Sequence, residues 1–183
     1  LNSVDKLLMH PEDPQILIAA TDVGIYKTTN GGTDWTLVQS GHHFKDMEFK
    51  PGDPSVIYAS TYIVYFGATI FRSTDGGDSF HELTQTGIPT NQVCRIELEV
   101  TNDNPDALFA LVCTPYTWGM EGIYKSGDSG DSWSQLISGD EQDLIGYSYT
   151  GGNQSGGQGF YNLTFAINPF DENDILVGGT HLW

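Results

Sequence analysis

Residues 73–80 read Ser-Thr-Asp-Gly-Gly-Asp-Ser-Phe, and related stretches occur at residues 28–35 (TTNGGTDW) and 126–133 (SGDSGDSW). The three copies start 45 and 53 residues apart. Each copy holds a hydroxyl residue, then Asp or Asn, then Gly, then an aromatic residue. These positions are Thr28, Asn30, Gly32 and Trp35, then Ser73, Asp75, Gly77 and Phe80, then Ser126, Asp128, Gly130 and Trp133. A motif that returns at this period indicates a repeat architecture.

A second pattern precedes each copy of the motif. A turn rich in Pro and Asp is followed by an apolar run, as in residues 10–14 (HPEDP) before 16–20 (ILIAA) and 50–54 (KPGDP) before 56–60 (VIYAS). Each unit therefore predicts four short strands, with the motif as the turn between the third and the fourth. The fold that we predict is all-β: an incomplete β-propeller of four-stranded antiparallel blades, with about three and a half blades in this chain.

The blade limits follow from the spacing of the two patterns. We expect one partial propeller over residues 1–183, with blades at about 1–39, 40–84 and 85–137 and a half blade at 138–183. The fourth unit has the Pro/Asp turn and a strand, but no copy of the motif before Trp183. We expect both ends to present uncovered sheet faces, which the remainder of the propeller or another chain covers. The alternative is a small self-contained stack of sheets.

The motif has a structural logic of its own. An Asp or Asn side chain accepts hydrogen bonds from backbone N–H groups of its own turn. The glycine supplies a backbone with positive φ, and the aromatic residue packs back on the blade. We interpret Asn30, Asp75 and Asp128 as residues that build turns, not as catalysts or metal ligands.

The motif resembles the Asp box, also called the bacterial neuraminidase repeat. This repeat occurs in β-propellers of sialidases, xyloglucan-active glycoside hydrolases and sortilin-type receptors. Residues 156–163 (GGQGFYNL) also resemble a stretch of secreted repeat proteins of Bacteroidetes-type bacteria. The resemblance implies a secreted, periplasmic or cell-surface protein. The triplets at residues 153–155 and 162–164 fit the glycosylation acceptor pattern, which agrees with that location.

The charge of the chain excludes some partners. Seven basic and 24 acidic residues give a formal net charge of −17. Such a surface repels phosphate groups, so we expect neither nucleic acid nor anionic membranes as partners. No stretch approaches the roughly 20 apolar residues of a membrane helix, and we expect no membrane insertion.

Aromatic residues gather in the connections between second and third strands and between blades. They are Tyr62, Tyr65, Phe66, Tyr116, Trp118, Tyr147 and Tyr149. Exposed rings offer flat apolar surfaces for sugar rings or peptide side chains. The sequence therefore predicts a recognition module for glycan or protein. The alternative is that these rings pack against neighbouring loops.

An enzymatic reading has one candidate residue. Asp22 follows the second strand, at a place that resembles the segment with one catalytic Asp in xyloglucanase-like glycoside hydrolases. Glycoside hydrolysis needs a second carboxyl group about 5 to 10 Å away, and the sequence assigns none. A sialidase site needs three arginines, but the chain holds only Arg72 and Arg95. We expect a non-catalytic protein, with a glycoside hydrolase as the alternative.

Metal and redox chemistry have weak support in the sequence. His42 and His43 have no cluster of other ligands at metal-binding spacing, so we expect no metal and no cofactor. Pairing Val100 with Ala107 in the third blade would place Cys94 opposite Cys113 on neighbouring strands. The two cysteines then form either a disulfide or a pair of buried free thiols.

Overall fold

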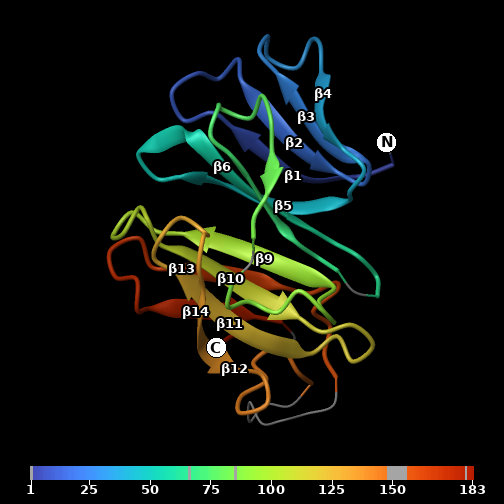
Figure 1. Cartoon of the computed structure of the whole chain (residues 1–183), viewed down its shortest axis with the longest axis vertical. Helices are drawn as coiled ribbons and strands as arrows, with labels where there is room; N and C mark the ends of the chain where they lie inside the picture. Colours follow the sequence, from blue (N-terminus) through green and yellow to red (C-terminus); the bar gives the residue numbers. More distant parts are fainter. Residues whose placement is uncertain (1, 66, 85, 148–155, 180) are drawn as a thin grey trace.

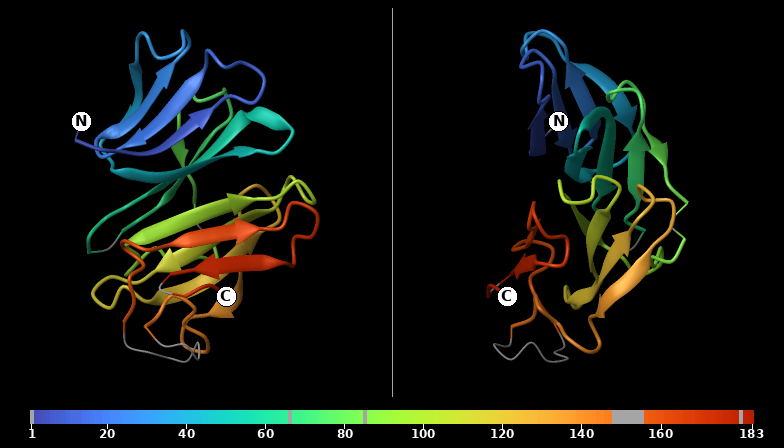
Figure 2. Two further views of the ribbon diagram at one scale, coloured as in Figure 1. Left: turned by 180° about the vertical axis from the view of Figure 1, so that it is seen from behind. Right: turned by 90° about the vertical axis from the view of Figure 1, so that its left-hand side faces the viewer.

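The computed structural model describes every residue except 1, 66, 85, 148–155 and 180. This part of the chain holds fourteen β-strands and no helix (Figure 1). Among the described residues there is consequently no helix that is long and apolar enough to cross a membrane. The strands form four antiparallel sheets that follow one another along the molecule (Figure 2).

Three sheets have four strands each, in sequence order. The first sheet has β1 (Val4–Met9), β2 (Leu17–Thr21), β3 (Gly24–Thr28) and β4 (Thr36–Ser40). The second has β5 (Phe44–Lys50), β6 (Asp53–Thr61), β7 (Ile70–Ser73) and β8 (His81–Glu82). The third has β9 (Arg95–Val100), β10 (Leu108–Cys113), β11 (Met120–Ser126) and β12 (Ser134–Ser138), and the fourth has only β13 (Thr164–Ile167) and β14 (Ile175–Gly178).

The first strands of the sheets contact one another in series, β1 with β5, β5 with β9 and β9 with β13. They are therefore the inner strands of propeller blades. The predicted fold class, an incomplete all-β propeller of four-stranded antiparallel blades, is confirmed. Connections from β2 to β3, β6 to β7, β10 to β11 and from sheet to sheet lie at one end of the strands. We call this end the loop face and the opposite end the turn face.

Apolar side chains form a core between each sheet and the next, because alternate residues of a strand point to opposite faces. The first core holds Ile18, Ile25, Met47, Phe71 and Phe80. The second holds Tyr58, Ile70, Leu98, Leu108 and Trp133, and the third holds Phe109, Leu111, Phe165, Ile167 and Val177. The cores fix the order of the sheets and so place their loops side by side.

The motif copies, residues 28–35, 73–80 and 126–133, form the turns between third and fourth strands, and we call them the repeat turns. In the second, Ser73 Oγ donates to Asp75 Oδ1 (2.7 Å) and accepts from Gly77 N (2.9 Å), while Asp75 Oδ1 accepts from Ser79 N (3.0 Å). The other two turns repeat these bonds. Hydrogen bonds from Ser132 lower the pKa of Asp128 to about 2, so its carboxylate is ionised at neutral pH.

The third sheet corrects the predicted position of the two cysteines. Val100 pairs with Leu108, not with Ala107, and Arg95 therefore stands opposite Cys113. Ala107 N instead donates to Asn104 O (2.9 Å), which closes the preceding turn and shifts the ladder by one residue. Both cysteines are buried free thiols.

Candidate functional site

Four segments of the loop face are joined by backbone hydrogen bonds. Ile63 N in the β6–β7 connection donates to Cys94 O (2.9 Å) at the start of the third sheet. Gly157 N, in the segment before the fourth sheet, donates to Thr117 O in the β10–β11 connection (2.9 Å), and Gly159 N donates to Trp118 O (2.9 Å). Segments far apart in the sequence thus form one continuous surface.

Two tyrosines from different segments meet on this surface. Tyr65 and Tyr116 are 61% and 69% exposed, and their ring centroids lie 6.3 Å apart at an interplanar angle of 42°. The two rings therefore contact each other across neighbouring loops and remain largely exposed. Both rings are open to a ligand.

A second group of rings lies beyond Thr117. The Trp118 ring is 4.8 Å from that of Phe160, and Phe160 is 6.3 Å from Tyr161. Phe160 and Tyr161 are exposed, whereas Trp118 is half-buried against the third core. Phe160 and Tyr161 were not among the aromatic residues predicted from the sequence as ligand contacts, and they lie before β13, which begins at Thr164.

The other predicted aromatic positions differ among themselves. Tyr147 is exposed, and its ring lies close to Gly156, which has a positive φ of 128°. Tyr62 is half-buried, and its ring packs 5.3 Å from that of His43 in the neighbouring β4–β5 connection. Phe66 and Tyr149 lie outside the described residues.

The backbone is strained where these rings are held. Tyr116 has a φ of 68° and Trp118 a φ of 58°, both in the left-handed region. A residue with a side chain is uncommon there, and such strain costs about 1–3 kcal/mol and gathers at functional sites.

We call the exposed rings Tyr65, Tyr116, Tyr147, Phe160 and Tyr161, together with Trp118, the aromatic face.

Charged side chains of the inner strands form a separate cluster. Lys6 Nζ lies 2.8 Å from Asp46 Oδ1 and 2.7 Å from Glu48 Oε1, and so joins β1 to β5. Asp46 Oδ2 also accepts a hydrogen bond from Leu98 N (2.8 Å) on β9. Burial lowers the pKa of Lys6, but the carboxylates of Asp46 and Glu48 outweigh it and the net shift is upward. Lys6 therefore remains a cation between the two blades.

Two further carboxyl groups on β9 extend this cluster. Burial, with the negative charge of Asp46, raises the pKa of Glu97 despite its ion pair with Arg95 (2.7 Å). Burial and the charges of Glu48 and Asp46 raise the pKa of Glu99 to about 8. The sequence analysis did not single out this cluster. Within the described ranges, no group of three or more His, Cys, Asp or Glu side chains is arranged to hold a metal ion.

Asp22 lies on the loop face, in the β2–β3 connection. Its carboxylate accepts hydrogen bonds from Asn2 N (3.0 Å), Asn2 Nδ2 (2.7 Å) and Ser3 N (3.4 Å). The bond from Asn2 N is the main cause of a lowered pKa. The carboxylate therefore holds the segment before β1, which is a structural use of the group.

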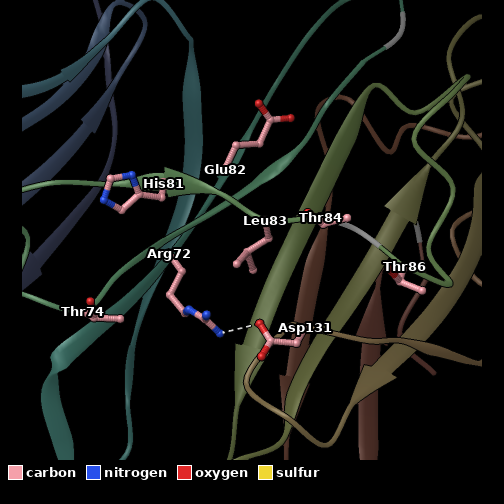
Figure 3. A pocket seen from close by; sticks show the side chains of 8 residues that line it. All are labelled: Arg72, Thr74, His81, Glu82, Leu83, Thr84, Thr86 and Asp131. Carbon is pink, nitrogen blue, oxygen red and sulfur yellow. Dashed lines mark hydrogen bonds and ion pairs between the residues drawn. The ribbon is translucent and has the colours of Figure 1, made fainter.

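A cavity of about 470 Å³ lies between the second and third sheets, away from the aromatic face (Figure 3). Its lining includes Arg72 from β7, His81 and Glu82 from β8, and Asp131 from the third repeat turn. Figure 3 shows Arg72 pointing across the seam toward Asp131, with which it forms an ion pair (3.0 Å). This pair connects two blades, and the charge of Arg72 is balanced by that of Asp131.

No protein-family model and no curated protein matches the sequence. Solved structures do match in fold. An ancestral GH74 enzyme has a TM-score of 0.67 at 16% identity, covering 100% of this chain and 25% of its own. The GH74 xyloglucanase from Xanthomonas campestris has a TM-score of 0.68 at 18% identity, covering 97% of this chain and 27% of its own. The fold is a β-propeller.

A third similar structure is YCF48 from Cyanidioschyzon merolae. Its TM-score is 0.51 at 16% identity, and the match covers 98% of this chain and 52% of YCF48. The chain thus spans about a quarter of the length of the GH74 structures and about half of YCF48. At such identities the likeness shows the propeller architecture alone.

Proposed function

We propose that this chain is a recognition module of a secreted or cell-surface propeller with Asp-box repeats, and that its aromatic face binds the ligand. The observation that carries the proposal is the exposed pair Tyr65 and Tyr116, which come from two blades and meet at 6.3 Å. The strained backbone at Tyr116 supports the proposal, because residues in such conformations gather at ligand-binding and active sites.

The chemistry of the face favours a glycan. Exposed aromatic rings stack on the apolar faces of sugar rings, while Tyr hydroxyls and nearby threonines supply hydrogen bonds. Thr114 and Thr117, whose hydroxyls lie 2.7 Å apart, flank the exposed ring of Tyr116. The net charge of −17 disfavours acidic polysaccharides and favours neutral ones. A protein ligand is the alternative, which the same rings would contact through apolar side chains.

Affinity electrophoresis tests the proposal. The chain is run through gels that contain a neutral polysaccharide, such as a β-glucan or xyloglucan, or an acidic one, such as polygalacturonate. We expect retardation by a neutral polysaccharide, and loss of it in Tyr65→Ala and Tyr116→Ala. Phe170→Ala is the matched control, since Phe170 is 87% exposed but lies on the turn face. If an immobilised peptide library gives binding that the same variants abolish, the ligand is a protein.

Localisation outside the cytoplasm is part of the proposal. The supporting observations are the resemblance of the repeat turns to Asp boxes and the acceptor triplet at residues 162–164. Asn162 is half-buried and its Nδ2 donates to Gln158 Oε1 (2.7 Å). The other triplet, at residues 153–155, lies outside the described residues. Fractionation of the native cells tests the location: recovery only from the cytosol would contradict it.

A further inference from the structure

The Asp or Asn of each repeat turn bonds, through its side chain, to the side chain four positions later. In the second turn Ser79 Oγ donates to Asp75 Oδ2 (2.6 Å). In the third turn Ser132 Oγ donates to Asp128 Oδ2 (2.6 Å). The later residue of both turns is thus a hydroxyl donor, and the earlier one is a carboxylate that accepts.

The first turn makes the same contact with donor and acceptor exchanged. Asn30 Nδ2 donates to Asp34 Oδ2 (3.0 Å), while Asn30 Oδ1 accepts from Asp34 N (2.9 Å), as the carboxylates of the other two turns accept from theirs. Because the later residue is an acid here, the earlier one needs both an acceptor and a donor, which an amide has and a carboxylate lacks. An aspartate at position 30 would instead face a second carboxylate, and the two charges would repel each other.

The residue after Asn30 makes this amide chemically vulnerable. Asn30 is followed by Gly31, and no other Asn of the sequence is followed by Gly. Asn side chains are thermolabile, and most so before glycine, which has no Cβ to hinder its backbone nitrogen. The Gly31 nitrogen attacks Asn30 Cγ, the side-chain nitrogen leaves as ammonia, and a cyclic imide forms. Water then opens the imide to aspartate or isoaspartate, so the reaction consumes water, releases ammonia and needs no other reactant.

The folded turn holds both reacting groups in other bonds. Gly31 N donates to Gln15 O (2.9 Å) in the connection between β1 and β2. The Asn30 side chain is bonded to Asp34, and Thr28 Oγ1 also donates to Asn30 Oδ1 (2.9 Å). Asn30 and Gly31 are both exposed, so water reaches them. The attack therefore requires a local opening of the turn, which breaks these bonds first.

We propose that Asn30–Gly31 is a deamidation site which the intact first repeat turn keeps unreactive, and that the product cannot rebuild the turn. Aspartate at position 30 is repelled by Asp34, and isoaspartate lengthens the backbone of the turn. Loss of ammonia makes the step irreversible, so a turn that has reacted stays open. The first repeat turn joins β3 to β4, the outer strand of the first sheet (Figure 1), and the reaction therefore loosens that strand. The site is independent of the ligand of the aromatic face.

Mass spectrometry of peptides from aged protein tests the reaction. The folded chain, the chain in denaturant and the folded Thr28→Ala variant are kept in the same mildly alkaline buffer. Thr28 Oγ1 bonds to Asn30 Oδ1 and accepts from Gly32 N (3.1 Å), so its removal favours opening of the turn. We expect conversion at position 30 to be fastest in denaturant and slowest in the folded wild type. Loss of one such bond should speed conversion of the folded variant about 2- to 12-fold.

Three results of this experiment would overturn the proposal. They are equal rates in the folded and denatured wild type, no conversion in denaturant, and a Thr28→Ala variant that converts no faster than the folded wild type. Circular dichroism confirms that the variant is folded before the rates are compared.

A double-variant cycle tests the consequence for the turn without any ageing. Asn30→Asp should lower the unfolding temperature, because the new carboxylate faces Asp34. In the Asp34→Ser background the same change creates the pairing of the second and third turns, so the loss should disappear. An equal loss in both backgrounds would show that the two carboxylates do not interact, and the proposal would fail.

The second turn provides the matched control, because its pair has the opposite arrangement. Ser79→Asp places a carboxylate against Asp75 and should lower the unfolding temperature. Addition of Asp75→Asn creates the pairing of the first turn and should restore most of the loss. A double variant that is no more stable than Ser79→Asp alone would contradict the pairing on which the proposal rests.

Discussion

Arg72 Nη1 on β7 lies 3.0 Å from Asp131 Oδ1 in the third repeat turn, and this ion pair joins the second sheet to the third. Lys27 and Asp78 hold the same two positions one blade earlier, 2.6 Å apart. In both pairs the cation directly precedes one repeat turn. Its partner lies in the next repeat turn, three positions after Asp75 or Asp128. The same relation thus recurs at the first two seams between blades.

Removal of the two partners should have unequal effects. Asp131→Asn loses only an exposed ion pair, so we expect a loss of about 0–1 kcal/mol in unfolding free energy. Arg72→Ala also loses the hydrogen bond from Nη1 to Ser129 O (2.9 Å), which adds about 0.5–1.5 kcal/mol. Urea unfolding of both variants and of the double variant measures the coupling. Equal losses would show that the bond to Ser129 contributes nothing.

Two neighbouring glycines test the seating of one blade on another. Gly76 and Gly77 both have positive φ, so alanine at either position carries strain of roughly 1–2 kcal/mol. At Gly77 the added methyl group also meets Ile18, and overpacking adds about 1–3 kcal/mol, whereas nothing lies within 4 Å of it at Gly76. The unfolding temperature of Gly77→Ala should therefore be lower than that of Gly76→Ala. The reverse order would contradict the described contact.

The inner-strand carboxyl groups should make stability depend on pH. The pKa of Glu99 is raised from 4.5 to about 8 in the folded chain, so the fold favours its protonated form. Stability from this group is present below about pH 4.5 and is lost as the pH rises toward 8. Glu99→Gln should therefore raise the unfolding temperature more at pH 8 than at pH 5.

Glu141→Gln provides the control for this pH dependence. Glu141 is exposed in the segment after β12, and its substitution by Gln removes the same charge as Glu99→Gln. Its substitution should shift the unfolding temperature equally at both pH values. If the two variants behave alike, the effect belongs to net charge and not to the buried cluster.

The two cysteines should be unreactive in the folded chain. Burial raises the pKa of Cys94 to about 11 and also raises that of Cys113, so little thiolate is present at neutral pH. A thiol reagent such as DTNB should label neither residue until denaturant is added, and then label both. Immediate labelling of one thiol would contradict the burial, and no labelling after unfolding would indicate a disulfide.

Asp22 should matter for the fold of the first sheet rather than for hydrolysis. Asp22→Asn removes a charged acceptor for Asn2 and Ser3, so we expect a lower unfolding temperature. The hydrolase hypothesis predicts instead that the wild-type chain releases reducing sugar from xyloglucan and that this variant does not. A reducing-sugar assay on both proteins distinguishes the two.

The sequence was sufficient for the fold because the motif repeats, and each copy carries its own turn chemistry. It could not give the register of Cys113, since that depends on whether Ala107 pairs with Val100 or closes its own turn. The contact between Tyr65 and Tyr116 depends on the angle between blades, which no local pattern encodes. The same holds for Arg72 and Asp131, whose pairing appears only once the blades are stacked.

All seven Lys and Arg residues of the chain lie in the described part and form ion pairs, and six of them reach from one sheet to another: Lys6, Lys27, Lys45, Lys50, Arg72 and Lys125. The few cations thus link blades that otherwise carry mostly negative charge. A reagent or modification that acylates lysines would therefore do more than make an acidic protein more acidic. It would remove five of those six ion pairs and leave the carboxylates of neighbouring blades to repel one another.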